Sequence, residues 1–285
     1  MNEPDAKVTA RTPITIDDLE DPRIEVFRDV REKDLRGRKH LFVGESELVL
    51  RRMVRQPDRL HAILLTHQKY DRVRDDLRTV PSHVPIYVTD VERLSQIAGF
   101  HIHRGVLVTG HRPTAEQLSM DSAFAGLRDR ASLTFVIAEG LTNVDNIGAL
   151  FRNAAAFGVD GILLDPTCCD PLYRKAVRVS MGHTLSTPYA VAQSWPDDLD
   201  RLRDEWGVRI VAAEITGASQ PVWTMPNAPR QALLFGSEGH GVSDGAIRRC
   251  DGVFHVPMHG DVPSLNVGVA SAVMLYEWMR PGRSV

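Results

Sequence analysis

The chain has few cysteines and no long apolar run. Its only cysteines in 285 residues are Cys168, Cys169 and Cys250, and the adjacent pair lacks the two-residue spacer of zinc-binding or thioredoxin-like motifs. No segment approaches the roughly 20 apolar residues of a membrane-spanning helix, and the N-terminus has no apolar run of signal-peptide length. We therefore expect buried thiols, no metal site, no membrane association and a soluble, cytoplasmic protein.

The sequence also lacks the overall positive charge that is typical of nucleic-acid-binding proteins, since its formal net charge is −3. The charge is unevenly distributed along the chain. Residues 21–112 contain 18 Lys and Arg against 13 Asp and Glu, whereas residues 113–285 contain 14 against 19. The first of these segments could bind a polyanion, although scatter over a solvated surface would give the same imbalance.

The N-terminal part of the chain predicts a small α/β domain. Residues 1–20 are polar without hydrophobic periodicity, which predicts a disordered tail. Over residues 21–112, short apolar runs alternate with amphipathic stretches, and Ser46 is expected to cap a helix whose apolar residues recur with helical spacing. Four strands are predicted, at 40–44, 61–66, 85–90 and 105–111.

Residues 113–131 contain a proline and no strong strand, so they are expected to form a linker that ends in a short helix. A second alternating series fills residues 132–285. Apolar strands that are regularly separated by helices predict a mostly parallel sheet buried on both faces. These strands are expected at 133–139, 161–165, 187–192, 208–214, 231–236 and 252–258.

The first of three segments with chemical potential is a predicted helix from about Ile147. Its apolar positions, from Leu150 to Gly158, follow the spacing of a face that packs on a sheet. Arg152 lies off this stripe, roughly 130° from its centre at about 100° per residue. The guanidinium would project near a helix N-terminus, which favours anions, although an ordinary surface arginine would look the same.

The second segment is a glycine-rich loop after a predicted strand, Gly236-Ser-Glu-Gly-His-Gly241. Glycine allows the backbone of such a loop to approach a ligand closely, although simple glycine turns are also common. A dinucleotide fingerprint would need glycine at Glu238 or His240, and no Walker-type lysine follows. NAD binding and nucleotide hydrolysis are therefore disfavoured.

The third segment precedes the last predicted helix, which runs from about Asn266 to Arg280. Ser264 and Asn266 flank Leu265 at the start of this apolar helix, and a capping role alone could explain both polar residues. The preceding Val256-Pro-Met258 run ends a strand at the edge where doubly wound sheets usually bind ligands.

Taken in this order, the three segments resemble the motifs of the SpoU/TrmH family of RNA 2′-O-methyltransferases, in the SPOUT class. The family's first motif pairs an asparagine with an arginine six residues later, here Asn146 and Arg152. Its second motif is the glycine-rich loop with a glutamate, here Glu238. Its third is a Ser-Leu-Asn run, here Ser264 to Asn266.

The resemblance covers about residues 133–279, and residues 21–112 are similar to the ribosomal-protein-like substrate-binding domain of many members. Residues 170–182 look like the family's basic segment. The chain departs from the family pattern at Asp145, where many members have glycine, and at an inserted-looking segment, residues 217–229.

The resemblance implies a parallel sheet with a deep trefoil knot and a homodimer formed through the knotted domains. S-adenosylmethionine would bind in the knot, and each active site would borrow residues across the dimer interface. The residues expected to line the cofactor site are Ala213, Gly236, Val256, Met258 and Leu265.

The family's proposed base corresponds to Arg152, but a guanidinium with a pKa above about 12 is almost never neutral. We therefore expect Arg152 to hold the adjacent phosphate and stabilise the developing alkoxide. Glu238 and Asn146 would orient it, while Ser264 and Asn266 would shape the cofactor and ribose site.

The predicted function is methylation of a ribose 2′-hydroxyl of RNA, with ribosomal RNA favoured over transfer RNA. The alternatives are a transfer RNA 2′-O-methyltransferase, a SPOUT enzyme that methylates a base nitrogen, and a non-catalytic RNA-binding relative. In the basic N-terminal domain, the residues expected to contact RNA are Arg36, Arg38, Lys39, Arg51, Arg52 and Arg55.

Overall fold

The computed structural model describes residues 12–28, 40–102 and 104–280, which form two compact units. The first unit comprises the described residues of Met1–Arg112 together with Leu172–Gly182. The second comprises Pro113–Pro171 and the described residues of His183–Val285. Leu172–Gly182 lies in the C-terminal half of the sequence, so its place in the first unit could not be read from chain order.

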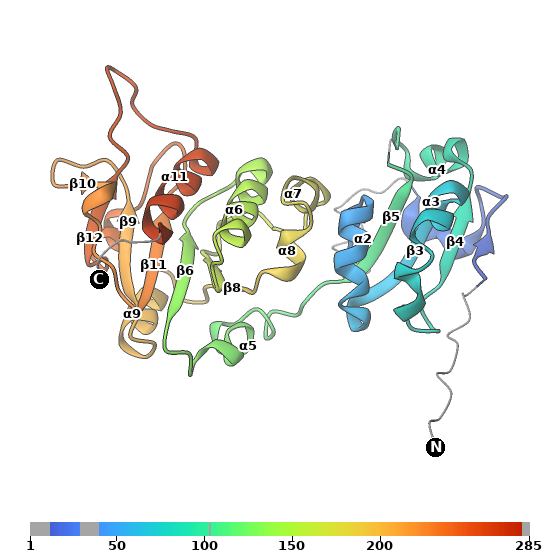
Figure 1. Ribbon diagram of the computed structural model, residues 1–285, viewed down its shortest axis with the longest axis horizontal. Coiled ribbons are helices and arrows are strands. Elements are labelled where there is room, and N and C mark those ends of the chain that lie inside the picture. The colour runs from blue at the N-terminus through green and yellow to red at the C-terminus, as the bar shows by residue number, and fades with distance from the viewer. Residues whose placement is uncertain (1–11, 29–39, 103, 281–285) are drawn as a thin grey trace. The chain divides into compact units, whose positions relative to one another are not determined.

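The first unit is built on a five-stranded sheet in the order β1-β4-β3-β5-β2 (Figure 1). Strands β1, β4 and β3 are parallel, whereas β5 is antiparallel to both β3 and β2. All four predicted strands are present. The strands are β1 (Ile14–Thr15), β2 (Leu41–Glu45), β3 (Leu60–Thr66), β4 (Ile86–Thr89) and β5 (Val106–His111).

Helices cover the sheet of the first unit, and their ends follow local capping rules. Helix α2 (Glu47–Val54) begins after Ser46, whose hydroxyl accepts from the amide of Val49 as predicted. The other helices are α3 (His67–Val73), α4 (Val91–Ala98) and α7 (Arg174–Val179). Helix α7 is tied to β2, because Arg174 and Arg178 both pair with the buried Glu45, at 3.2 and 3.1 Å.

The predicted tail over residues 1–20 is wrong for its described end. Ile14 and Thr15 pair in parallel with Tyr87 and Val88 as strand β1, and Ile16 is fully buried. Two residues are too few to show the alternation that identifies a strand in sequence. Residues 1–11 lie outside the described part of the chain.

The second unit is a seven-stranded parallel sheet in the order β10-β12-β9-β11-β6-β7-β8. A parallel sheet was predicted, and its strands match the predicted apolar runs. They are β6 (Leu133–Ala138), β7 (Gly161–Leu164), β8 (Tyr189–Val191), β9 (Arg209–Ala213), β11 (Arg230–Phe235) and β12 (Gly252–His255). The additional edge strand β10 (Gln220–Pro221) lies in the inserted-looking segment and pairs with β12.

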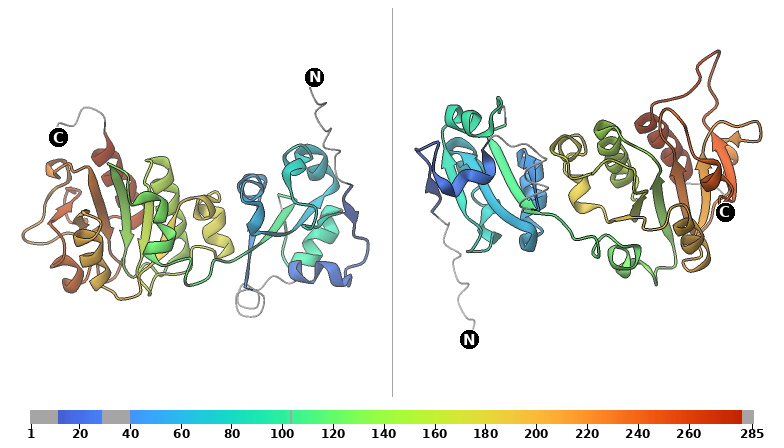
Figure 2. Two further views of the ribbon diagram at one scale, coloured as in Figure 1. Left: turned by 90° about the horizontal axis from the view of Figure 1, so that it is seen from below. Right: turned by 180° about the vertical axis from the view of Figure 1, so that it is seen from behind.

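Helices pack on both faces of this sheet, as Figures 1 and 2 show. The packing explains why its strands are apolar at consecutive positions, which is the pattern of a sheet buried on two sides. Neighbouring helices α6 and α11 are joined where Asn153 donates to the Gly268 carbonyl and the Ser271 hydroxyl. The helices are α5 (Met120–Ala123), α6 (Val144–Ala156), α8 (His183–Ser186), α9 (Asp197–Asp204), α10 (Asp244–Ile247) and α11 (Val267–Met279).

Residues 113–131 are not a free linker, which corrects the sequence prediction. Met120, Phe124 and Leu127 belong to the core of the second unit, and the ring of Phe124 packs 5.0 Å from that of Phe135. The sequence hid this role because the apolar positions lie on one short helix and one 3-10 turn, too little for a clear period.

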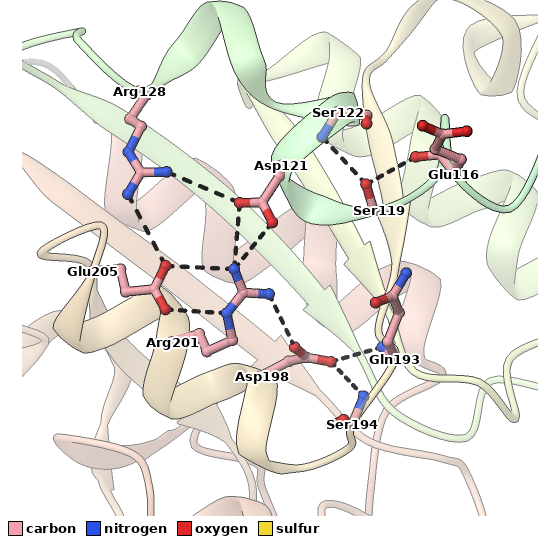
Figure 3. Close-up of polar contacts among 10 residues, drawn as sticks. All are labelled: Glu116, Ser119, Asp121, Ser122, Arg128, Gln193, Ser194, Asp198, Arg201 and Glu205. Atoms are coloured by element: carbon pink, nitrogen blue, oxygen red, sulfur yellow. Dashed lines mark hydrogen bonds and ion pairs between the residues drawn. The ribbon is translucent and has the colours of Figure 1, made fainter.

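Ion pairs also connect this segment to α9 (Figure 3). Arg201 of α9 lies 3.1 Å from Asp121, and Arg128 lies 4.0 Å from Glu205 at the end of α9. These side chains are 37% to 57% exposed, so solvent screens each pair and its contribution to stability is small. Burial of the apolar side chains therefore does most to hold the segment in place.

None of the helices in the described ranges is long and apolar enough to cross a membrane. The three cysteines are free and half-buried. Burial raises the pKa of Cys169 to about 11 and that of Cys250 to about 12, so both thiols stay protonated near neutral pH. The trefoil knot stays a prediction, because strand order does not describe how a chain threads its own loops.

Replacement of Phe124 by alanine tests the packing of residues 113–131. We expect Phe124→Ala to lower the free energy of unfolding by about 3–5 kcal/mol, because it leaves a cavity beside Phe135 and Trp206. The measurement is urea unfolding followed by circular dichroism. Replacement of the exposed Glu116 is the control and should stay within about 0.5 kcal/mol of the parent. Equal stability of the two variants would mean that the segment is a linker after all.

Candidate functional site

Three segments that are far apart in sequence meet through a hydrogen-bonded group of side chains. The Asn146 amide donates to Glu238 Oε1 at 2.5 Å. The Asn266 amide donates to the same carboxylate oxygen and to Asn146 Oδ1, each at 2.9 Å. We call Asn146, Glu238 and Asn266 the Asn-Glu-Asn triad. It joins α6, the loop after β11 and the start of α11.

Helix capping positions two members of the triad. Asn143 caps α6 by accepting from the amide of Asp145 at 2.8 Å, so the helix begins at Val144 rather than near Ile147 as predicted. Asn146 then lies in the first turn and is 5% exposed. Asn266 caps α11 with its Oδ1, which accepts from the amide of Gly268, and this leaves its amide group for the triad.

The glycine-rich loop that carries Glu238 is a tight reversal of the chain. The backbones of Ser237 and Gly241 exchange two hydrogen bonds, of 3.1 and 2.9 Å. A Cβ on Gly236 would lie 2.1 Å from the carbonyl carbon of Gly241, and Gly241 itself has φ +66°. The loop therefore requires glycine at both positions, as expected for a close approach of two backbone segments.

A cavity of about 520 Å³ lies at the carboxyl ends of β9, β11 and β12, bounded by the glycine-rich loop and the start of α11. This is the edge where open parallel sheets bind ligands. The cavity is of the size of small-molecule sites, about 300–1,000 Å³. All five residues predicted to hold a cofactor line it, namely Ala213, Gly236, Val256, Met258 and Leu265.

The predicted catalytic residues divide into two groups. Glu238, Ser264 and Asn266 line the cavity, and Asn146 contacts it through the triad. Arg152 does not line the cavity. It lies on the exposed face of α6, and no hydrogen bond or ion pair joins it to another residue in the described part of the chain. Its guanidinium is thus available to an external anion.

Glu214 is a site residue that the sequence interpretation missed. It lines the cavity, and its carboxylate accepts from the amides of Val242 at 2.8 Å and Ile215 at 2.9 Å. It thereby fixes the end of the glycine-rich loop. Glu139 acts similarly on the residue after Val242, because its carboxylate accepts from the amide of Ser243 at 2.8 Å. The available signal was an acidic residue directly after an apolar strand, in VIAE and VAAE.

The basic residues predicted to contact RNA have different surroundings. Arg51 pairs with Asp76 at 2.9 Å, and Arg52 donates to the carbonyl of Met181 at 2.9 Å. Arg55 is exposed and has no ion pair with the described residues. Burial, and then the nearby charge of Arg55, lower the pKa of Arg52. Arg36, Arg38 and Lys39 lie outside the described residues.

Comparison with known proteins gives a consistent family. The sequence profile of the SpoU rRNA Methylase family matches residues 133–276. The chain is 36% identical over 278 residues to an uncharacterized tRNA/rRNA methyltransferase of Mycobacterium bovis, an alignment that covers 94% of this chain and 92% of the relative. It is 23% identical to the 23S rRNA (guanosine(2553)-2′-O)-methyltransferase RlmP of Bacillus subtilis, over 92% of this chain and 97% of the relative.

Solved structures share the fold. The AdoMet-bound rRNA methyltransferase of Sinorhizobium meliloti has a TM-score of 0.78 and 22% identity, and the match covers 93% of this chain and 97% of that one. The SpoU methyltransferase AviRb of Streptomyces viridochromogenes, in complex with AdoMet, has a TM-score of 0.75 and 21% identity. That match covers 91% of this chain and 98% of the other. The observed parallel sheet is thus the predicted SPOUT arrangement.

Two glycines of the loop provide a matched pair of substitutions. We expect Gly236→Ala to destabilise the loop, because the new methyl group would meet backbone atoms of Gly241 and Val242 at 2.1 to 2.2 Å. Gly239→Ala is the control, since a Cβ there has no atom within 4 Å. Hydrogen exchange of the amides from Ser237 to Ser243 should become at least about tenfold faster in Gly236→Ala alone. Similar exchange in the two variants would contradict this account of the loop.

Proposed function

The chain belongs to the SpoU rRNA methylase family, and from that premise we propose that it transfers a methyl group from S-adenosylmethionine to a ribose 2′-hydroxyl of RNA. The observation that carries the proposal is the Asn-Glu-Asn triad at the edge of the cavity. Ribosomal RNA is the favoured substrate, because the relative RlmP is named as a 23S rRNA 2′-O-methyltransferase and spans nearly the same length. A transfer RNA substrate is the alternative.

The cavity fits S-adenosylmethionine in size and chemistry. Apolar side chains of Val256, Met258 and Leu265 offer contacts for an adenine ring, and Gly236 exposes backbone at the strand end. The carboxylate of Glu214, on the cavity wall, is a suitable acceptor for ribose hydroxyls. When bound, S-adenosylmethionine supplies an electrophilic methyl group on a sulfonium.

Arg152 would act on the RNA rather than as a base. A guanidinium stays protonated at any pH at which the enzyme works, so it cannot accept the proton of the 2′-hydroxyl. Its exposure suits contact with the phosphate next to the target ribose and stabilisation of the oxyanion as the proton leaves. The phosphate oxygen next to the ribose would be the first acceptor of that proton.

The triad would set the shape of the reacting region. Glu238 accepts from both asparagines, so its carboxylate is held in one orientation and the glycine-rich loop is fixed to α6 and α11. Ser264 lies two residues before Asn266 on the cavity wall, and its hydroxyl has no hydrogen bond to any residue that the structure describes. Its exposed hydroxyl is therefore suited to bind cofactor or ribose.

Transfer of a tritiated methyl group from S-adenosylmethionine to RNA tests the function directly. Label that stays on the nucleoside as a 2′-O-methylribose supports the proposal. Label on the free base would indicate a base methylase, and no transfer to ribosomal or transfer RNA would indicate a non-catalytic RNA-binding relative. Mapping of ribose methylations in RNA from cells that lack the gene would then give the target.

Replacement of Arg152 separates catalysis from cofactor binding. We expect Arg152→Ala to reduce kcat at least about 100-fold, because one charged stabiliser of the oxyanion is removed. The Kd for S-adenosylmethionine should change less than about twofold, since Arg152 does not line the cavity. Arg209→Ala is the matched control, because Arg209 is an exposed arginine at the amino end of β9, whereas the cavity lies at the carboxyl ends of the strands. An active Arg152→Ala enzyme would remove this side chain from the mechanism.

We further propose that the second unit forms a homodimer, with the knotted regions packed together. Helix α11 is apolar on nearly all sides, and Val269, Val273 and Tyr276 form an exposed stripe with helical spacing. Tyr276 is 60% exposed, and such a stripe on the surface of a single chain favours a protein partner. A second copy would also bring another Arg152 within reach of the site. The expected location of the dimer is the cytoplasm.

A charged residue in the stripe tests the dimer. We expect Val273→Glu to convert a dimer to a monomer in size-exclusion chromatography with light scattering, because two buried charges would face each other across a twofold axis. Val91→Glu is the control, since Val91 is 57% exposed on the first unit. Unchanged mass of the Val273→Glu variant would place the interface elsewhere.

A further inference from the structure

A second cavity, of about 400 Å³, lies in the first unit, far in sequence from the motifs described above. It is at the edge of the sheet where β3 and β4 begin and β5 ends. Polar and planar side chains from separate segments line it, and none of them has a role in the proposed reaction. We call it the histidine pocket, and its polar lining residues are Arg23, Asp58, His61, His83, Tyr87 and His111.

The backbone is irregular at the centre of this pocket. In the antiparallel pairing of β3 and β5, Leu60 faces Gly110 and Ala62 faces Thr109. His61 is therefore an extra residue, the position of a β-bulge. Bulges redirect a side chain and are frequent beside binding sites.

His61 is also held in a fixed orientation. Its Nδ1 lies 3.1 Å from Thr109 Oγ1, and this buried hydroxyl donates its own proton to the carbonyl of Ala62 at 3.3 Å. The imidazole Nδ1 must therefore donate to Thr109. The ring meets His111 edge to face, with centroids 5.4 Å apart and an angle of 84°. Two imidazole rings are thus preorganised beside the cavity.

The charges of the pocket disfavour a phosphate group. Arg23 is the only arginine among the described residues that line it, and its guanidinium contacts Asp21 at 2.5 to 3.0 Å. Hydrogen bonds from Arg23 lower the pKa of Asp21 to about 2, so the aspartate is ionised and compensates the arginine. Asp58 adds a negative charge to the rim. An isolated anion would find little net attraction here.

A metal ion is also a poor match. No group of three or more His, Cys, Asp and Glu side chains in the described part of the chain is arranged to hold one. The ligand that suits flat imidazole and phenol rings with hydrogen-bond acceptors is a neutral planar molecule with donors on its edge. A nucleobase has these properties, and proteins bind unpaired bases by stacking and by contacts to their edges.

We propose that the histidine pocket binds one unpaired nucleobase of RNA, so that the first unit recognises single-stranded nucleotides as well as duplex phosphates. The inference rests on the proposed function, since it takes RNA as the substrate. A base enters a cavity of this size without its neighbours, whereas a paired base does not leave its stack without loss of stacking energy. The pocket thus selects RNA with a loop or bulge.

The test uses the full chain without methyl donor and two fluorescent RNA probes of equal length and charge. One is a hairpin with a loop of unpaired adenosines, and the other is a fully paired duplex. Fluorescence anisotropy should show tighter binding of the hairpin. His61→Ala and His111→Ala should each lower the affinity for the hairpin about tenfold and leave the affinity for the duplex unchanged. The control is His67→Ala, an exposed histidine outside the pocket, which should change neither.

His111 is exposed, so its replacement keeps the test valid if the half-buried His61 variant does not fold. Equal affinity for hairpin and duplex in the parent, or equal effects of His111→Ala and His67→Ala, would overturn the proposal. Competition by free adenosine monophosphate that His111→Ala abolishes, without a hairpin preference, would assign the pocket to a free nucleotide instead. Because no methyl transfer is measured, failure of the proposed function would not change these results.

Discussion

The Asn-Glu-Asn triad is the interaction on which the arrangement of the site depends. Its three hydrogen bonds join Asn146 to Glu238, 92 residues later, and to Asn266, 120 residues later. The acceptors are one carboxylate oxygen of Glu238 and the amide oxygen of Asn146. A carboxylate that accepts from two amides is fixed in direction, and so are the helices that carry them. Without Glu238, the side-chain amides of Asn146 and Asn266 would lose their shared acceptor. An unsatisfied, partly buried donor destabilises the folded state by more than an exposed hydrogen bond stabilises it. The triad thus holds the glycine-rich loop and the start of α11 in place beside the cavity.

Acidic residues at the ends of strands support the same region. Glu139, Asp165 and Glu214 each follow an apolar strand, and each accepts from a backbone amide in the loop after a neighbouring strand, namely Ser243, Gly140 and Val242. Loops at the carboxyl edge of a parallel sheet have many amides without a partner in the sheet, so a carboxylate there orders several of them at once. This explains how glycine-rich, potentially flexible loops can present a defined surface to a ligand. Arg152 differs from these residues, since it is exposed and no hydrogen bond or ion pair joins it to another described residue.

The two units differ in the kind of surface that each offers to a ligand. The second has a cavity at the end of a buried sheet, which suits a small cofactor. The first combines exposed arginine on α2 with a pocket of flat side chains at its sheet edge, which suits a polymer with both phosphates and bases. Leu172–Gly182 lies in the C-terminal half of the sequence but packs in the first unit through the Glu45 ion pairs.

Local sequence was enough to determine most strands and helices, because apolar spacing and capping residues act over a few positions. The runs around Phe135 and Leu233 predicted the parallel sheet, and the order of Asn146, Glu238 and Asn266 predicted the family and the cavity lining. Tertiary structure alone decided what distant contacts create. Phe124 is buried because it packs in the core of the second unit, which no periodic pattern in the sequence predicted. Ile14 is in a strand because it pairs with β4 at the edge of the sheet. The bulge at His61 and the support from Glu214 likewise depend on partners that no short stretch of sequence contains, because a hydrogen bond between remote residues exists only once the chain has folded.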